Sequence, residues 1–327
     1  DLLREARSSY SSVQIGITKN EILENLTNAI DLEALKYNDI QVWISSVEGW
    51  GRQHVYLYKG TNALKESTSL KSANALKATL KRLKLHNHWE SDAQPEFPEQ
   101  LTLGRITFDG ECLRATWHQR LEKWSRAKSL DHESEEIDGD LVEFRAYRQV
   151  LMRSLLRLVV FPKRNKVAIF VQVPLSDTLH RKAKKMAEDL GKKLFDFGAL
   201  KSVDISHCIK SLDQAEIDAA SPNAEHGRIT SQNTKFGAGG ATVEFKAGSE
   251  EVAWKAIGPV RRVRRALQTD SFTGQSGKFE VELASGTGMN RTTTMSLDGT
   301  DGRIYFWSQM TESEVWLMLD KLRSHTN

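Results

Sequence analysis

Apolar and polar residues alternate from Phe144 to Val160, which predicts a β-strand with one apolar face and one face rich in arginine. The spacing between Val150 and Leu158 also fits a helix, and periodicity alone does not decide between the two. After a turn at Pro162, the branched apolar residues from Val167 to Val173 predict a second, buried strand. We therefore expect two consecutive strands in the middle of the chain.

Amphipathic helices are predicted where apolar residues recur every three or four positions. These segments are Thr18–Tyr37, Ser69–Leu85, Leu179–Leu194, Glu250–Leu267 and a closing helix that begins at Thr311. Ser176 is positioned to cap the third helix. Thr311 and Glu314 have the spacing of a capping box, in which each side chain accepts a hydrogen bond from the backbone of the other residue.

Short strands bounded by turn residues make up most of the remaining pattern. They are Ile40–Ser46 with His54–Tyr58, Leu101–Phe108 with Cys112–His118, Ser202–Ile209, Thr242–Lys246, Phe279–Leu283, Thr292–Leu297 and Ile304–Ser308. The first two pairs read as hairpins, the second of which turns at Asp109 and Gly110. The mixture predicts an α+β fold with several small antiparallel or mixed sheets and packed helices.

Composition changes along the chain predict three domains. A proline-containing stretch, Asp92–Gln100, separates an N-terminal α+β domain (residues 1–95) from a central basic α/β domain (96–220). The acidic stretch Asp213–Glu225 leads into a C-terminal domain (221–327) that is richer in glycine, serine and threonine and in strand signals. A chain of 327 residues is long enough for this multi-domain organisation.

Positive charge is concentrated in the centre of the chain. The stretch from Leu141 to Lys210 has fifteen Lys or Arg residues and six Asp or Glu residues, whereas the whole chain has 46 and 43. A solvated helix face would carry such charge, and so would a surface that contacts phosphates. We expect the second, because arginine side chains bind phosphate oxygens bidentately and several contacts give salt-dependent binding.

The preferred interpretation is a protein that binds DNA or RNA through its phosphate backbone. The basic residues expected to make these contacts are Arg145, Arg153, Arg157, Arg181, Lys185, Arg261 and Arg264. The last two belong to a second basic cluster outside the centre, which would lengthen the surface that contacts phosphates.

An acidic run directly precedes the basic stretch. Its acidic side chains are Asp131, Glu133, Glu135, Glu136, Asp138 and Asp140. A solvated loop is the simpler interpretation. The alternative is that this segment lies over the arginines and competes with a polyanion.

Aromatic residues gather around the first predicted hairpin. They are Trp43, Trp50, His54, Tyr56 and Tyr58. Aromatic rings beside a basic surface can stack on bases, but at alternating strand positions they are more typical of a core, and we expect these to be core residues.

A metal-dependent nuclease is the alternative from the enzyme class. Glu244 and Lys246 form an E-x-K triplet on a predicted strand, and Asp218 is an upstream carboxylate. In such sites two carboxylates hold the cation and the lysine orients the attacking water. The triplet is common in ordinary strands, so the motif alone does not establish the chemistry. Magnesium is expected only if this alternative holds, and otherwise we predict no cofactor.

A second candidate metal site is the His86-Asn87-His88 sequence. Two histidines separated by one residue lie on one side of a strand and can begin a zinc site. No third ligand is evident in the sequence, and histidine is also common near helix ends. We therefore expect no metal here.

Cysteine content and hydropathy indicate the compartment. Cys112 and Cys208 are far apart and predict free buried thiols in a reducing cytoplasm. No apolar run approaches the roughly 20 residues that span a bilayer, so no membrane partner is expected.

A third functional class also fits the charge pattern, namely a scaffold subunit that binds an acidic protein partner.

Overall fold

The computed structural model describes residues 2–16, 18–36, 40, 48–60, 62–91, 98–132, 134–172, 177–218, 229–246, 258–269, 271–283 and 291–326. Its helices are α1 (Leu2–Ser9), α2 (Lys19–Asp31), α4 (Asn62–Glu66), α5 (Ala73–Arg82), α6 (Asp177–Leu194), α7 (Ile205–Asp218), α8 (Gly258–Ala266) and α9 (Glu312–Ser324). Single 3₁₀ turns occupy Thr68–Leu70, His86–His88, Lys128–Leu130 and Phe197–Ala199.

The strands belong to one large antiparallel sheet and one small one. They are β1 (Gln53–Lys59), β2 (Thr102–Phe108), β3 (Leu113–Arg126), β4 (Glu135–Ile137), β5 (Asp140–Val142), β6 (Tyr147–Phe161), β7 (Lys166–Gln172), β8 (Lys201–Ser202), β9 (Ile229–Ala238), β10 (Ala241–Lys246), β11 (Thr273–Leu283), β12 (Arg291–Asp298) and β13 (Arg303–Phe306). The large sheet has eleven strands in the order β10-β9-β11-β12-β13-β1-β7-β6-β3-β2, with β8 paired to β1. The strands β4 and β5 pair only with each other.

The structure confirms the α+β class and corrects the prediction of several small sheets. Strands from all three predicted segments pair side by side, because β1 lies between β13 and β7. One hydrophobic cluster likewise contains Val55, Val159 and Phe306, one residue from each segment. The predicted boundaries therefore fall between elements of a shared sheet.

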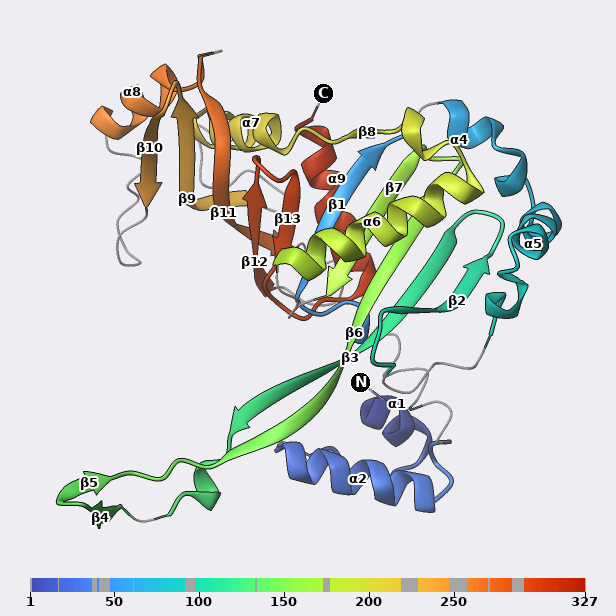
Figure 1. The fold of residues 1–327 in the computed structure, drawn as a ribbon, viewed down its shortest axis with the longest axis vertical. Helices are drawn as coiled ribbons and strands as arrows, with labels where there is room; N and C mark the ends of the chain where they lie inside the picture. Colours follow the sequence, from blue (N-terminus) through green and yellow to red (C-terminus); the bar gives the residue numbers. More distant parts are fainter. Residues whose placement is uncertain are drawn as a thin grey trace.

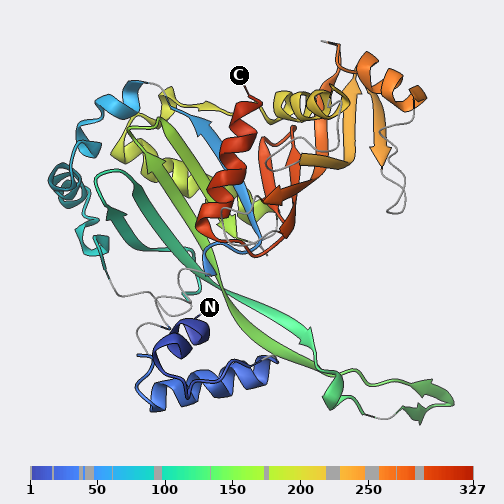
Figure 2. The same ribbon diagram turned by 180° about the vertical axis from the view of Figure 1, so that it is seen from behind.

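Helices cover the central strands on both faces (Figures 1 and 2). On one face, α5 and α6 bury residues such as Leu80 and Ala187 against Tyr58 and Ile169 of the sheet. On the other face, α7 and α9 pack on the opposite side chains of β1, β7 and the C-terminal strands. The central strands are thus buried on both sides, which explains the continuous apolar run in β7.

Several local predictions are confirmed at the predicted residues. The predicted strand Phe144–Val160 is β6, which begins at Tyr147, and it is not a helix. It pairs with both β3 and β7. Thr18 caps the N-terminus of α2 and Thr311 caps that of α9, each through a complete capping box. The turn at Gly110 has φ +89°, a backbone conformation that glycine adopts readily.

The prediction of a strand at Ser202–Ile209 is wrong. Only Lys201–Ser202 pairs with β1, and α7 begins at Ile205. The side chain of Asp204 accepts a hydrogen bond from the backbone N–H of His207 at 3.0 Å, as a helix cap does. Ile205, Cys208 and Leu212 then lie on the buried side of the helix.

Three other predictions lie largely or wholly outside the described residues. They are the strand Ile40–Ser46, the cap Ser176 and residues 250–257 of the helix expected at Glu250–Leu267.

An arm of two strands projects from the body of the protein. The inner halves of β3 and β6 lie in the sheet, and their outer halves continue past it as a ribbon that ends in β4 and β5 (Figures 1 and 2). We call residues Leu121–Arg126 paired with Tyr147–Met152 the stem of this arm, and Asp131–Glu143 its tip. The helices α1 and α2 form a separate small cluster around Leu3, Val13 and Ala29.

No helix among the described residues is long and apolar enough to cross a lipid bilayer.

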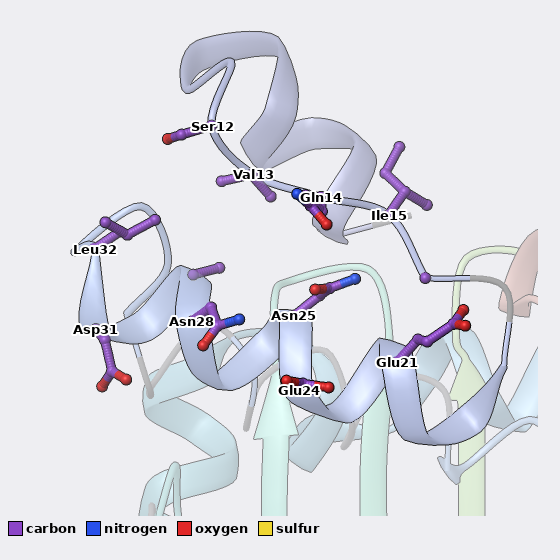
Figure 3. A pocket seen from close by; sticks show the side chains of 12 residues that line it. Ser12, Val13, Gln14, Ile15, Glu21, Glu24, Asn25, Asn28, Asp31 and Leu32 are labelled. Atoms are coloured by element: carbon purple, nitrogen blue, oxygen red, sulfur yellow. The ribbon is translucent and has the colours of Figure 1, made fainter.

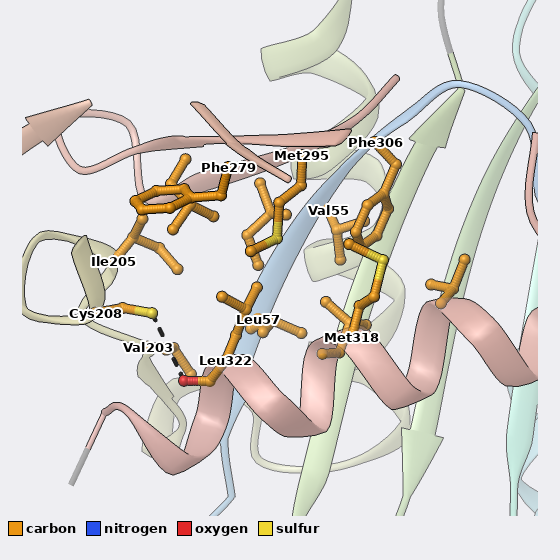
Figure 4. Close-up of a cluster of buried hydrophobic side chains, with 14 of the residues drawn as sticks. Val55, Leu57, Val203, Ile205, Cys208, Phe279, Met295, Phe306, Met318 and Leu322 are labelled. Atoms are coloured by element: carbon orange, nitrogen blue, oxygen red, sulfur yellow. Dashed lines mark hydrogen bonds between the residues drawn. The ribbon is translucent and has the colours of Figure 1, made fainter. Parts of the chain in front are cut away.

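Both cysteines are free and buried, as predicted. Cys208 lies in the core between α7 and α9, where its thiol donates to the carbonyl oxygen of Leu322 at 3.6 Å (Figure 4). Burial raises the pKa of the Cys112 and Cys208 thiols to about 12. Since the thiolate is the reactive form, burial and the raised pKa disfavour reaction of both thiols in the folded protein.

We therefore expect Ellman's reagent to react very slowly with the native protein at pH 8 and to titrate two thiols at once in denaturant. The two absorbance time courses, recorded without reductant, test this. A rapid reaction in the native protein, or fewer than two thiols after unfolding, would contradict the assignment of two free buried cysteines.

Candidate nucleic-acid interface

The helix α6 presents a row of basic side chains to solvent. Arg181, Lys182, Lys185 and Lys193 are exposed, and none of them forms an ion pair with the part of the chain that the structure describes. Lys192, also exposed, pairs with Asp189 at 3.3 Å. We call the five residues Arg181, Lys182, Lys185, Lys192 and Lys193 the basic row.

The apolar side of α6 explains why the basic row faces outward. Ala183, Ala187 and Leu190 recur at helical spacing and are buried against the sheet. The hydroxyl of Tyr58 donates to the Glu188 carboxylate at 2.7 Å, and both burial and this hydrogen bond raise the pKa of Tyr58. Packing and a buried polar contact thus set the rotation of the helix about its axis.

A row of aromatic rings connects α6 with the C-terminal strands. His180 on α6 meets His54 on β1 edge to face, with ring centroids 4.3 Å apart. His54 stacks on Tyr305 of β13 at 4.6 Å, and Tyr305 meets Trp307 at 4.5 Å. We call these four residues the aromatic row.

A cavity of about 340 Å³ opens beside the aromatic row. Polar side chains line most of it, among them Asn233, Lys278, Asp298 and Arg303, together with His54 and Tyr305. They come from β9, β11, β12, β13 and β1, on the sheet face opposite α7 and α9. The helices α7 and α9 pack against the other face of these strands, where Phe279, Met295 and Phe306 are buried.

The sequence contained only a partial signal for this surface. The strand Ile304–Ser308 was predicted, and in the structure Ile304 and Phe306 are buried while Tyr305 and Trp307 face the other way. Alternation shows that these residues lie on opposite faces, but it does not show which face a helix covers. Among the aromatic residues near β1, Trp50, Tyr56 and Tyr58 are core residues, as predicted, and Trp43 lies outside the described residues.

Two of the arginines predicted to contact phosphates are buried. The guanidinium of Arg157 lies over the Trp50 ring at 3.8 Å, donates to the Gln53 side chain at 2.8 Å and also donates to the Gly49 carbonyl oxygen. Burial lowers its pKa to about 9. Arg157 therefore holds the segment before β1 against the sheet and does not reach solvent.

Arg264 is the second buried arginine. Its guanidinium pairs with Asp213 and, at 3.0 Å, with Glu216, so that it joins α8 to α7. Both Arg264 and Asp213 have at most 1% of their side chains exposed. The prediction that Arg157 and Arg264 contact phosphate is corrected, because each is enclosed and engaged within the protein.

The other predicted arginines are at the surface in different places. Arg145 lies on the arm and pairs with Glu143 at 2.8 Å, and Arg153 lies at the base of the arm and pairs with Glu48. Arg261 is exposed on α8. Only Arg181 and Lys185, among the predicted contacts, belong to one continuous basic surface.

The residues of the nuclease alternative do not form one site. Lys246 pairs with Glu244 at 3.5 Å, and Glu244 also accepts a hydrogen bond from Asn233 at 3.0 Å. Val243 and Phe245, the neighbours of Glu244 on β10, pack toward the core that α7 covers. Asp218, at the end of α7, is thus on the other side of the sheet from Glu244.

The histidine pair also lacks the geometry of a metal site. His86 and His88 lie in a 3₁₀ turn and not in a strand, and a ring nitrogen of His88 is 3.4 Å from the Gly104 carbonyl oxygen. Across all the residues that the structure describes, no three His, Cys, Asp or Glu side chains are placed to hold a metal ion.

The acidic run does not cover the basic row of the same chain. It forms β4, β5 and the turn between them at the end of the arm, and in both views this tip lies away from α6 (Figures 1 and 2). Any competition between these carboxylates and a polyanion for the basic row would therefore require a second molecule.

A larger cavity, of about 640 Å³, lies between α2 and the segment that precedes it (Figure 3). Its polar lining includes Glu21, Glu24, Asn25 and Asn28, and it contains neither basic nor aromatic side chains. It does not extend the anion-binding surface.

We expect Arg157→Met to lower the free energy of unfolding by about 2 to 4 kcal/mol, because two hydrogen bonds of a buried cation and its ring contacts are lost. Arg181→Met removes an exposed arginine of the same size and should change stability by less than about 0.5 kcal/mol. Urea unfolding followed by circular dichroism measures both. Equal effects of the two substitutions would contradict the structural role of Arg157.

No protein-family model matches the chain, and no curated protein is similar to it at a significant level. The functional conclusion therefore depends on the surface formed by the basic row, the aromatic row and the cavity beside it.

Proposed function

We propose that this protein binds nucleic acid, and that the basic row of α6 contacts the phosphate backbone. The observation that carries the proposal is the set of exposed basic side chains on one rigid helix, of which Arg181, Lys182 and Lys185 have no ion-pair partner among the described residues. Side chains that are already neutralised contribute little to binding a polyanion, whereas these three are available for phosphate oxygens.

The position of α6 favours a phosphate-binding role for its basic row over a role in solubility alone. At His180, α6 meets the aromatic row, and beyond it lies the cavity that Lys278 and Arg303 line. A strand of nucleic acid that follows the basic row would therefore reach further polar and aromatic groups. A helix that carries lysine only for solubility has no need of such a neighbour.

Two further parts of the proposal concern the other contacts and the compartment. Arg145, Arg153 and Arg261 would add secondary contacts, because the first two are held in ion pairs and the third lies on a different helix.

The two free, buried thiols fit a reducing compartment, and we place the protein in the cytoplasm.

The triple variant Arg181→Ala, Lys182→Ala, Lys185→Ala tests the proposal. We expect its affinity for a labelled oligonucleotide at low salt to fall about tenfold or more, and the dependence of log K on log salt to become shallower by roughly 2 to 3. Fluorescence anisotropy titrations across a salt series measure both quantities for duplex and single-stranded DNA and for RNA.

The matched control is Lys65→Ala, Lys71→Ala, Lys81→Ala, which removes the same charge from exposed positions on α4, α5 and the segment between them. A loss of affinity equal to that of the triple variant on α6 would show that net charge and not the basic row is responsible. Absence of binding by the wild-type protein at low salt would refute the proposed function.

A further inference from the structure

We infer that the cavity beside the aromatic row binds an unpaired nucleobase, so that the protein prefers single-stranded nucleic acid. This inference rests on the proposed function, and it names the substrate class for the same surface. It is carried by the rings next to the cavity, by the polar groups that line it and by its position relative to the basic row.

The rings provide a surface on which a base can stack. The Trp307 side chain is 42% exposed, although most large apolar residues of this half of the sheet are buried. Its indole N–H donates to the Ser296 hydroxyl at 2.8 Å, and its backbone carbonyl accepts from Arg52 at 2.9 Å. Both contacts hold the ring in place, so stacking on it costs little conformational entropy.

The neighbouring rings enlarge this surface and orient it. Tyr305 lies between His54 and Trp307, and the Lys278 ammonium is 5.7 Å from the centre of the Trp307 ring. A base that stacks on Trp307 would therefore have a cation close by for the adjacent phosphate. Stacking of bases on aromatic rings flanked by basic groups is the usual way in which proteins bind single strands.

The lining of the cavity supplies hydrogen-bonding groups of both kinds. Asn233 has an amide whose nitrogen donates to Glu244 at 3.0 Å and whose oxygen is a further acceptor. Asp298 accepts from the backbone N–H groups of Thr300 and Asp301, and the Arg303 guanidinium donates to it at 3.1 Å. Donors and acceptors of this sort pair with the Watson–Crick edge of a base, and that edge is free only when the base is unpaired. The volume of about 340 Å³ is within the range of sites for small molecules.

The aromatic row connects this cavity to the basic row. His180 is on the first turn of α6, directly before Arg181, and three successive ring contacts lead from it to Trp307. A single strand bound to α6 can thus turn its bases toward the cavity. A duplex offers phosphates to α6 but keeps its base faces within the stack.

The substitution Trp307→Ala separates these two modes of binding. We expect affinity for a single-stranded oligonucleotide to fall roughly tenfold to a hundredfold, while affinity for a duplex of the same length and the salt dependence of both stay unchanged. Trp307→Phe should restore most of the loss, because it retains an aromatic face. Tyr10→Ala removes another exposed aromatic ring, away from the cavity, and serves as the control.

The anisotropy titrations distinguish failure of the base-binding cavity from failure of nucleic-acid binding as a whole. If the wild-type protein binds but Trp307→Ala lowers the affinity for single strand and duplex equally, or for neither, the base site is wrong and the basic row stands. If the wild-type protein binds no nucleic acid at low salt, the proposed function itself fails.

A second inference comes from the arm and does not depend on nucleic acid. We propose that the arm pairs with the arm of a second copy of this chain, so that the protein is a dimer. The stem carries large apolar side chains exposed on both of its faces, among them Trp124 (65% exposed), Tyr147, Val150, Leu151 and Met152. Isolated two-stranded ribbons are only marginally stable, and exposed apolar patches of this kind usually mark an interface.

The charges of the arm identify a second copy as the partner. The tip contains seven Asp or Glu residues and no Lys or Arg. The stem has the opposite sign, since Lys123, Arg126 and Arg148 outnumber its one acidic residue, Glu122. Two arms that lie antiparallel place the acidic tip of each on the basic stem of the other, and this is the self-complementary arrangement of a two-fold dimer.

The side chains that would meet are free to do so. On one face of the stem, Lys123 and Arg148 lie beside Val150 and Met152, because opposed residues of an antiparallel pair point to the same side. Lys123 and Arg148 form no ion pair with any described residue, and the same holds for Glu135, Glu136, Asp138 and Asp140 of the tip. Asp131 and Glu143, at the two ends of the tip, already pair with Arg126 and Arg145 of the same chain. The other described carboxylates of the tip lie on β4, β5 and their turn, away from the basic row (Figure 1), and are available to another molecule.

Charge reversal on each side tests this dimer. Analytical ultracentrifugation should show a wild-type dimer that dissociates as salt is raised. Both the tip variant Glu135→Lys, Glu136→Lys and the stem variant Lys123→Glu, Arg148→Glu should be monomers. An equimolar mixture of the two variants should restore a dimer, because both tip-to-stem contacts then join opposite charges: the lysine tip meets the glutamate stem, and the acidic tip meets the basic stem.

The control Glu24→Lys, Asp31→Lys reverses two exposed acidic residues of α2 and should leave the dimer intact. A wild-type protein that is monomeric at every concentration reached would overturn the inference. A dimer that persists in both variants would also overturn it, because the contact would then lie elsewhere on the surface.

Discussion

The backbone hydrogen bonds between β3 and β6 join the hydrophobic core to the arm that leaves it. Near Leu113 and Val160 the two strands are fully buried, whereas near Arg126 and Tyr147 the same ladder is exposed to solvent. An antiparallel pair satisfies its inner backbone groups along its whole length, so it can continue past the sheet where a single strand could not. The direction of the arm, and therefore the position of its acidic tip, follows from how the inner half is held in the core.

Where the ladder enters the core, Arg157 organises its surroundings. Its guanidinium stacks on Trp50 and bonds to Gly49 and Gln53, so the segment that leads into β1 is attached to β6 across the sheet. The strand β1 in turn lies between β7 and β13 and so joins the two halves of the sheet. No carboxylate of the described residues forms an ion pair with this buried cation, which is costly. The ring faces, the Gln53 side chain and the Gly49 carbonyl oxygen compensate for part of that cost.

The candidate interface consists of the faces of α6 and of the C-terminal strands that do not pack into the core. Since the apolar stripe of α6 and the hydrogen bond of Tyr58 to Glu188 set the rotation of the helix, its basic row faces outward. On the C-terminal strands, α7 and α9 cover one face only, and Tyr305 and Trp307 lie on the other. One face of these strands therefore belongs to the hydrophobic core, and the other face forms the polar, aromatic surface.

Local sequence patterns determined a large part of the fold. Alternation identified β6, branched apolar residues identified β7, and the Thr311–Glu314 spacing identified the start of α9. These signals depend on residues that are close in the sequence and interact within one element. The strand predicted at Ser202–Ile209 was wrong because a short apolar run fits the periodicity of a strand and that of a helix equally well. In the structure, the Asp204 side chain caps a helix at this point.

Only the tertiary structure decided which charges and rings are available. The sequence showed Arg157, Arg181 and Arg264 as equivalent basic residues, yet two of them are enclosed by partners more than 45 positions away in the chain. The cavity beside Trp307 likewise needs side chains from five strands. Burial depends on contacts between distant segments, and a pattern of neighbouring residues contains no information about what will cover them.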